Sequence, residues 1–284
     1  MKLQQILALV LLLSMMFNAG LQLDRAQIVS MLVRYRILVR ALVANFIIVP
    51  LGAFIVVKFL NVNDLIATGL LLMAMAPGVP FVILTGGKAK GGSHELAVAL
   101  ALLLPVASFV TIPITAQLLL PAADRVEVPP SQLFGLLAFQ VLPLLVGVLF
   151  AALAPAAADK LKAPIGRLTM ISLIALFAVL VPAIVRALFS VIGTRGIIAA
   201  VVIDVLSLAI GWVFGGRDPE ERFTFAIGTA LRNPAIAALI ATTSYPGTAV
   251  AAGVTTYFLV QFLGATIFGG AKMRALLGTG AANP

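Results

Sequence analysis

Long apolar stretches follow one another along almost the whole of this chain of 284 residues. A helix needs about 20 predominantly apolar residues to cross the hydrocarbon core of a bilayer. Windows that meet this criterion lie at residues 4–23, 39–60, 65–86, 95–119, 132–154, 167–190, 195–215, 221–243 and 248–270. Because lipid offers no hydrogen-bond partner to an unpaired backbone amide, each window is predicted to be helical. We therefore expect an all-α, multi-pass membrane protein of about nine spans, with a single transmembrane domain over residues 1–284.

The composition agrees with this prediction and excludes several other classes of protein. Hydrophobic residues make up 62% of the chain and charged residues only 10%, whereas soluble domains carry about 25% charged residues. There is no cysteine and only one histidine, His94, so thiolate chemistry and a zinc cluster are not expected. The net charge of +9 comes from basic residues scattered between apolar stretches, which is typical of membrane loops and not of a nucleic-acid-binding surface. We expect membrane lipid and a small molecule as partners, no nucleic acid, and no metal site; the oligomeric state is left open.

The distribution of basic residues predicts the orientation in the membrane. The apolar start of the chain, residues 1–17, resembles a signal peptide, but it continues to Leu23 without an Ala-x-Ala cleavage site, so we interpret it as the first span. Thirteen of the 19 Lys and Arg residues then lie on the side that follows the odd-numbered spans, and five lie on the other side. The positive-inside rule places the N-terminus outside and the C-terminus in the cytoplasm. The alanine-rich composition favours a bacterial plasma membrane.

Two spans are interrupted near their midpoints. The third contains Pro77, Gly78 and Pro80, and the eighth contains Arg232, Asn233 and Pro234. Proline removes a backbone donor and clashes with the preceding turn, so both helices are predicted to unwind there. Paired interruptions in corresponding positions of two halves indicate a transporter's substrate site. Other prolines are interpreted as ordinary kinks, namely Pro50, Pro105, Pro143 and Pro182.

Two opposite charges fall within the apolar windows. Arg232 lies near the centre of the eighth window and Asp204 near the middle of the seventh. Such residues are costly in lipid and are usually functional. They are predicted to neutralise each other, either as a buried pair that only fixes helix packing or with Arg232 as the counter-charge for an anion and Asp204 as a charge-balancing or proton-binding residue. The predicted substrate-binding residues are Pro77, Gly78, Thr85, Thr229, Arg232 and Asn233. By contrast, His94 and Glu95 are interpreted as the start of a helix.

These residues resemble the bile acid:sodium symporter family. Met16–Leu21 is similar to the family's Met-Phe-x-x-Gly-Leu motif, Ala76–Gly78 looks like its first crossing helix, and Arg232–Ala237 falls at its second break. The resemblance implies an inverted-repeat bundle with two crossing, discontinuous helices. It also implies a core of spans two, three, four, seven, eight and nine, which rocks against a panel of spans one, five and six.

The chain departs from the family pattern at the positions that bind sodium. Gly228 stands where the resemblance implies a glutamate, Arg232 where it implies a glutamine, and Ala97 and Ala101 where it implies hydroxyls; apolar residues near Phe81 replace a Ser-Asn pair. Sodium needs several oxygen ligands, so two-sodium coupling is not expected. The resemblance implies symport with sodium, so the candidate coupling ions are Na⁺ and H⁺, and no other cofactor is expected. We predict that the Arg232 guanidinium supplies a permanent positive charge in place of a sodium ion, with coupling through protons or no coupling at all.

The sequence therefore predicts a secondary transporter for a small organic anion, which is a bile-acid-like molecule or a smaller carboxylate or sulfonate. A non-transporting membrane sensor with a transporter-like fold is the alternative, although a sensor needs an output module. A membrane-embedded enzyme is not expected, because the sequence has no recognisable nucleophile–base set, metal cluster or paired carboxylates in its spans.

Overall fold

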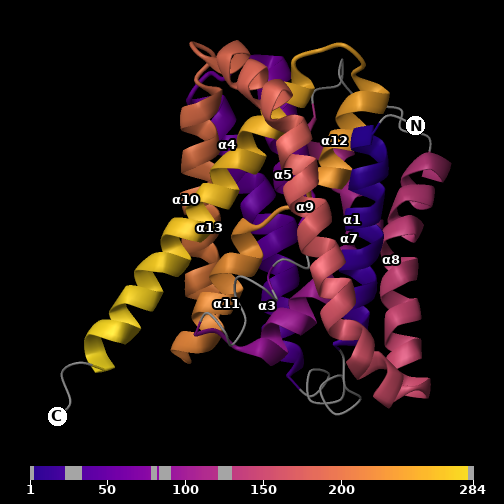
Figure 1. Ribbon diagram of the computed structural model, residues 1–284. Helices are drawn as coiled ribbons and strands as arrows, with labels where there is room; N and C mark the ends of the chain where they lie inside the picture. Colours follow the sequence, from indigo (N-terminus) through magenta and orange to yellow (C-terminus); the bar gives the residue numbers. More distant parts are fainter. Residues whose placement is uncertain (1–2, 23–33, 78–81, 83–90, 121–129, 281–284) are drawn as a thin grey trace.

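In a computed structural model of the protein, residues 3–22, 34–77, 82, 91–120 and 130–280 are described. Outside short connections these residues are helical (Figure 1). The helices are α1 (Leu3–Leu21), α3 (Tyr35–Val43), the π-helix η1 (Ala44–Ile48), α4 (Val49–Phe59), α5 (Asp64–Met75), α7 (His94–Leu119), α8 (Pro130–Leu153), α9 (Pro155–Val191), α10 (Gly196–Phe214), α11 (Pro219–Ala230), α12 (Pro234–Ser244) and α13 (Val250–Gly280).

The predicted all-α class is confirmed for the residues that the structure describes. By length and composition, three uninterrupted helical segments could cross a membrane: Tyr35–Phe59, Gly196–Phe214 and Val250–Lys272. A fourth is α7, if its parts on either side of a 61° bend near Ser108 form one span. The other described helices lie within or over the remaining predicted windows, and the total of nine spans stays a prediction.

The outer surface of the bundle carries many large apolar side chains. Ile55 and Phe59 of α4 are 65% and 82% exposed, and Val205 of α10 and Ile267 of α13 are also exposed. A soluble monomer rarely exposes so many apolar side chains together. In a bilayer the same surface contacts lipid tails at no comparable cost, so the exterior agrees with a membrane-spanning bundle.

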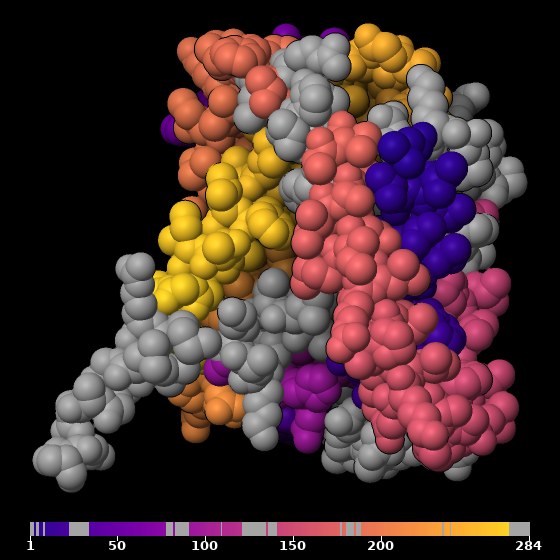
Figure 2. Space-filling view, in the orientation of Figure 1, coloured from indigo at the N-terminus to yellow at the C-terminus, as the bar shows by residue number. Residues whose placement is uncertain are grey.

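Helices α1, α8 and α9 pack together. α1 lies along both α8 and α9, and in the space-filling view α9 covers the face between α1 and α13 (Figure 2). The α1–α8 contact is closest at two glycines: a Cβ added to Gly20 would lie 2.2 Å from the Leu144 carbonyl oxygen, and one added to Gly147 would lie 2.4 Å from the Phe17 carbonyl oxygen. Small residues allow helix backbones to approach this closely in membranes.

The remaining helices form a second group. α5 packs against α13, and α10 packs against α11, α13 and α4. A glycine pair again permits the α5–α13 approach, because a Cβ on Gly69 would lie 2.3 Å from the Val250 carbonyl oxygen. The two interrupted spans, α5 and α11–α12, belong to this group.

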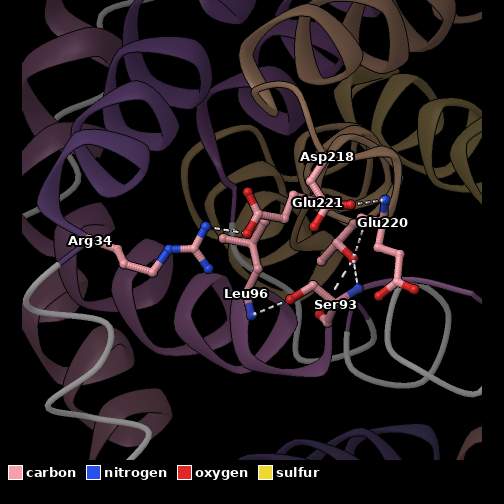
Figure 3. A network of polar contacts seen from close by, with 7 residues as sticks. Arg34, Ser93, Leu96, Asp218, Glu220 and Glu221 are labelled. Atoms are coloured by element: carbon pink, nitrogen blue, oxygen red, sulfur yellow. Dashed lines mark hydrogen bonds and ion pairs between the residues drawn. The ribbon is translucent and has the colours of Figure 1, made fainter.

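Polar contacts join the N-termini of α7 and α11 at one end of the bundle (Figure 3). Ser93 caps α7 by accepting a hydrogen bond from the Leu96 amide, and the Ser93 amide donates to the Thr224 hydroxyl at 2.8 Å. The helix start predicted at His94 is therefore confirmed. Arg34, just before α3, forms an ion pair with Glu221 of α11, so three segments distant in sequence meet at this end.

Candidate functional site

Both predicted helix interruptions are present as far as the structure describes them. α5 ends at Met75, immediately before Ala76 and Pro77, and residues 78–81 lie outside the described part. α11 ends at Ala230 and α12 begins at Pro234. The chain turns between these two helices near mid-height of the bundle (Figure 1). Proline at the first position of α12 loses no intrahelical hydrogen bond, because the first amides of a helix have no partner within it.

The two unwound segments pair with each other. Pro77 and Arg232 form an isolated antiparallel bridge, and the Asn233 amide donates to the Ala76 carbonyl oxygen at 2.6 Å. The Asn233 side chain also caps α12 by accepting from the Ile236 amide at 3.4 Å. The Ser108 hydroxyl, at the bend of α7, lies 3.2 Å from the Pro77 carbonyl oxygen. Among the described residues, several backbone groups released by the breaks thus find partners across the crossing, as an apolar interior requires.

Gln261 of α13 satisfies the other edge of the second break. Its Oε1 accepts from the Arg232 amide at 2.8 Å, and its Nε2 donates to the Arg232 carbonyl oxygen at 3.1 Å. One side-chain amide therefore replaces the two hydrogen bonds that a continuous helix would have given to Arg232. This contact holds the segment in its extended form.

The Arg232 guanidinium is completely buried, with 0% exposure. Its Nη1 donates to the Asn45 carbonyl oxygen at 3.3 Å. That oxygen is available for two local reasons. Within η1 the Val49 amide bonds to the Ala44 carbonyl oxygen and so does not reach Asn45, and the next residue, Pro50, has no amide hydrogen to donate. Pro50, predicted to be an ordinary kink, thus helps to expose the acceptor that Arg232 uses.

Several buried polar atoms around Arg232 lack a regular hydrogen bond. Arg232 Nε and Nη2, Asn45 Oδ1, Asp204 Oδ1 and the Tyr257 hydroxyl make no hydrogen bond of regular geometry, although this hydroxyl lies close enough to the guanidinium and to Ser207 to interact with both. The charge of Arg232 acts on both Asp204 and Tyr257. Buried polar groups normally find partners. These donors and acceptors around one cation are the groups to which a polar ligand would bond.

Asp204 lies in this polar cluster without touching Arg232 directly. Its side chain is 2% exposed. Among the described residues the ion pairs are Arg34–Glu221 and Lys162–Asp159, so Asp204 and Arg232 do not form a contact ion pair. Gly264 of α13 makes room for the carboxylate, because a Cβ at that position would lie 2.0 Å from Asp204 Oδ2.

The structure brings most of the predicted site residues together. Pro77, Arg232 and Asn233 meet at the crossing, and Asp204 lies near the guanidinium. Thr229 is buried one turn before the break, with its hydroxyl 3.5 Å from Asn45 Nδ2. The remaining two predicted residues, Gly78 and Thr85, lie outside the described residues.

Sequence reasoning did not single out Asn45, Tyr257 or Gln261. A signal was present in the spacing. Tyr257, Gln261 and Gly264 follow at i, i+4 and i+7, and therefore lie on one face of α13. Asn45 precedes Pro50 by five residues, which is the spacing of a π-helical hydrogen bond that proline cannot make.

The positions at which sodium ligands were expected are surrounded by apolar atoms. A Cβ on Gly228 would lie 2.7 Å from Leu100 Cδ1 and 3.3 Å from a Val82 methyl group. Ala97 and Ala101 are buried in the same apolar cluster. The side chains described there provide no oxygen ligand for a cation.

The chain is similar to known proteins in two comparisons. The profile of the Sodium Bile acid symporter family matches residues 9–202. The chain is also 30% identical over 117 residues to the P3 protein of Homo sapiens, a match that covers 38% of this chain and 23% of the human protein. The family match includes the first break and ends at residue 202, so Asp204 and Arg232 lie beyond it.

Proposed function

The chain belongs to the sodium bile acid symporter family, and from that premise we propose that it is a secondary transporter for a small organic anion. The family consists of membrane transporters, and the apolar helices described above fit a multi-pass membrane protein. The single observation that carries the proposal is the buried guanidinium of Arg232 at the crossing of two interrupted helices.

Arg232 is suited to bind an anion. Its Nη1 is held by the Asn45 carbonyl oxygen, while Nε and Nη2 make no hydrogen bond of regular geometry. A carboxylate or sulfonate accepts two parallel hydrogen bonds from a guanidinium, and such charge-assisted pairs are stronger than neutral ones. Removal from water further strengthens the attraction between the charges. The substrate proposed is therefore a bile-acid-like molecule or a smaller carboxylate or sulfonate.

Two groups of helices support a mechanism of alternating access. α1 packs closely on α8 and α9, whereas the interrupted helices pack with α10 and α13. α9 contacts α13, and α8 contacts α7, along the boundary between the groups. We propose that these groups rock against each other and expose Arg232 to each side of the membrane in turn, as in transporters built around a site at mid-membrane.

Arg232 also replaces a sodium ion in this proposal. The packing around Gly228, Ala97 and Ala101 is apolar, so the side chains described there offer no oxygen ligand to a sodium ion. The guanidinium contributes a permanent positive charge and joins the second break to η1 through Asn45. Sodium is then not needed to hold the crossing together.

The test is uptake of labelled taurocholate by the purified full chain in proteoliposomes, with benzoate and benzenesulfonate as smaller anions. Arg232→Ala should lower the uptake rate by about 100-fold or more, because truncating one member of a buried charge pair costs about 2–5 kcal/mol. Arg232→Lys should retain part of the activity. Arg167→Ala, which removes an exposed arginine of α9, is the matched control and should leave uptake unchanged.

Two results would contradict the proposal. The first is unchanged uptake by a folded Arg232→Ala protein. The second is saturable binding of taurocholate without any flux, which would favour the sensor alternative. Strict dependence of uptake on sodium, with two ions per substrate, would contradict the part of the proposal that assigns the ion's role to Arg232.

A further inference from the structure

Asp204 is a carboxylate that is buried away from water and forms no contact ion pair among the described residues. The residue is 2% exposed in the middle of α10, and Oδ1 has no hydrogen-bond partner. Oδ2 lies against the backbone of Gly264, where any larger residue would collide with it. A buried carboxylate that is ionised and unpaired is strongly disfavoured, so this side chain depends on a nearby positive charge or on a proton.

The groups facing Asp204 limit which of these it uses. Arg232 approaches from the second break, Tyr257 approaches from α13, and Ser207 lies one turn further along α10, beside Tyr257. Arg232 is the single cation among these groups and lies close enough to attract the carboxylate without contact. When no anion is bound, the charges of Asp204 and Arg232 compensate each other across the site.

A bound anion changes this balance. The anion accepts hydrogen bonds from Nε and Nη2 of Arg232, which make no regular hydrogen bond within the protein. Its negative charge then neutralises the guanidinium, so Asp204 is left without a counter-charge in a low-dielectric interior. Uptake of a proton by the carboxylate restores neutrality, since one monoanion and one proton add no net charge. The empty site and the loaded site are then both neutral, which is the condition under which a buried site can cross the apolar barrier at least cost.

We propose that Asp204 is the binding site of a coupling proton, which it takes up when an organic monoanion occupies Arg232 and releases together with that anion on the other side of the membrane. The proton forms an O–H bond with the carboxylate on loading and leaves an ionised carboxylate on release, so no other reactant is required. This inference rests on the proposed function, and it makes the transporter an electroneutral proton–anion symporter.

The experiment uses the full chain in sodium-free proteoliposomes, with the membrane potential clamped at zero and labelled taurocholate as the probe. The sulfonate of taurocholate stays ionised, so accumulation cannot arise from diffusion of a neutral acid. An acidic exterior should drive accumulation by the unmodified protein, and imposing a membrane potential should not change it. In Asp204→Asn, accumulation driven by the pH gradient should disappear, whereas exchange of external for internal taurocholate should persist, because the loaded site of this variant is neutral.

A second measurement follows the proton itself. Taurocholate added to the purified protein in weak buffer with a pH dye should cause uptake of about one proton per bound anion, and none in Asp204→Asn, because binding and protonation are thermodynamically linked. Asp159→Asn, which removes an exposed carboxylate of α9, is the control and should keep both the accumulation and the proton uptake. Gly264→Ala should weaken the pH-driven accumulation by displacing the carboxylate, whereas Gly270→Ala, on the same helix with nothing within 4 Å, should not.

The outcomes separate this inference from the proposed function. Accumulation driven by the pH gradient in a folded Asp204→Asn protein, or binding of taurocholate without proton uptake in the unmodified protein, would overturn the role of Asp204 while leaving anion transport by Arg232 intact. Absence of taurocholate uptake under every gradient would overturn both.

Discussion

The α1–α8 contact and the crossing at Arg232 bring helices together in opposite ways. Around Gly20 and Gly147 both helices are continuous, and their backbones approach because neither glycine has a side chain. At the crossing the helices are interrupted, and Pro77 and Arg232 form a bridge in which the Asn233 amide donates to the Ala76 carbonyl oxygen. In a continuous helix these backbone groups would have bonded within the helix. The first contact depends on shape and the second on hydrogen bonds.

This difference separates scaffold from site. In a contact between complete helices the backbone groups are satisfied within each helix, so the contact can be rigid without offering its backbone to a ligand. The crossing needs a partner from another element, Gln261, and it leaves Nε and Nη2 of Arg232 without a regular hydrogen bond. We therefore expect substitutions at the glycine contact to change stability alone, and substitutions at the crossing to change transport.

Among the substitutions that test this difference, Gln261→Leu should have the largest effect. This substitution leaves the Arg232 amide and carbonyl oxygen buried without partners, at a cost of about 1–3 kcal/mol for each group. Both the thermal stability and the rate of anion uptake should fall. Gln117→Leu, at an exposed position of α7, provides the matched control. A Gln261→Leu protein with normal stability and uptake would mean that the extended form of the second break does not depend on α13.

A smaller effect, confined to stability, is expected from Gly20→Ala. The new Cβ would lie 2.2 Å from a backbone oxygen of α8 that cannot turn away, and overpacking of this kind costs about 1–3 kcal/mol. The unfolding temperature in detergent should fall, while the KM for taurocholate of the folded fraction should stay the same. Gly135→Ala, on α8 with nothing within 4 Å of its Cβ, should have no such effect. A changed KM with unchanged stability would reverse the distinction between the two contacts.

The sequence was sufficient for the properties that depend on composition and on single residues. Apolar windows predicted the all-α class, and proline with its neighbours predicted both interruptions, because a missing amide hydrogen acts locally. Arg232 and Asp204 were recognisable because charge is rare in apolar stretches. The helix start at His94 and Glu95 followed from the preference for an acidic residue in the first turn of a helix, which is also local.

The partners of these residues could not be predicted in the same way. Gln261 lies 29 positions from Arg232, and Asn45 lies 187 positions from it, so only the packing of α13 and η1 against the second break brings them together. Asn45 also contributes its backbone oxygen, which no side-chain pattern reveals. The contribution of Pro50 becomes visible only with the π-helical register, because the same proline in a regular α-helix would expose the carbonyl of Phe46 instead.

Pro50→Ala tests whether this proline helps to expose the Asn45 carbonyl oxygen, and it should give the smallest effect. Alanine restores an amide hydrogen. In the π-helical register this amide bonds to the Asn45 carbonyl oxygen and competes with Arg232 for it. In the α-helical register it bonds to the Phe46 carbonyl oxygen, and the Asn45 carbonyl oxygen shifts away from Arg232. One hydrogen bond contributes about 0.5–1.5 kcal/mol, so the uptake rate should fall about two- to tenfold, because each 1.36 kcal/mol is about a factor of ten. Stability should stay the same or rise, because proline in a helix interior is unfavourable. Pro143→Ala, inside α8, is the control: it gives α8 the same added amide and should leave uptake unchanged. If both substitutions left uptake unchanged, the exposed carbonyl of Asn45 would not be needed to hold Arg232, and the crossing would depend on Gln261 and the paired backbones alone.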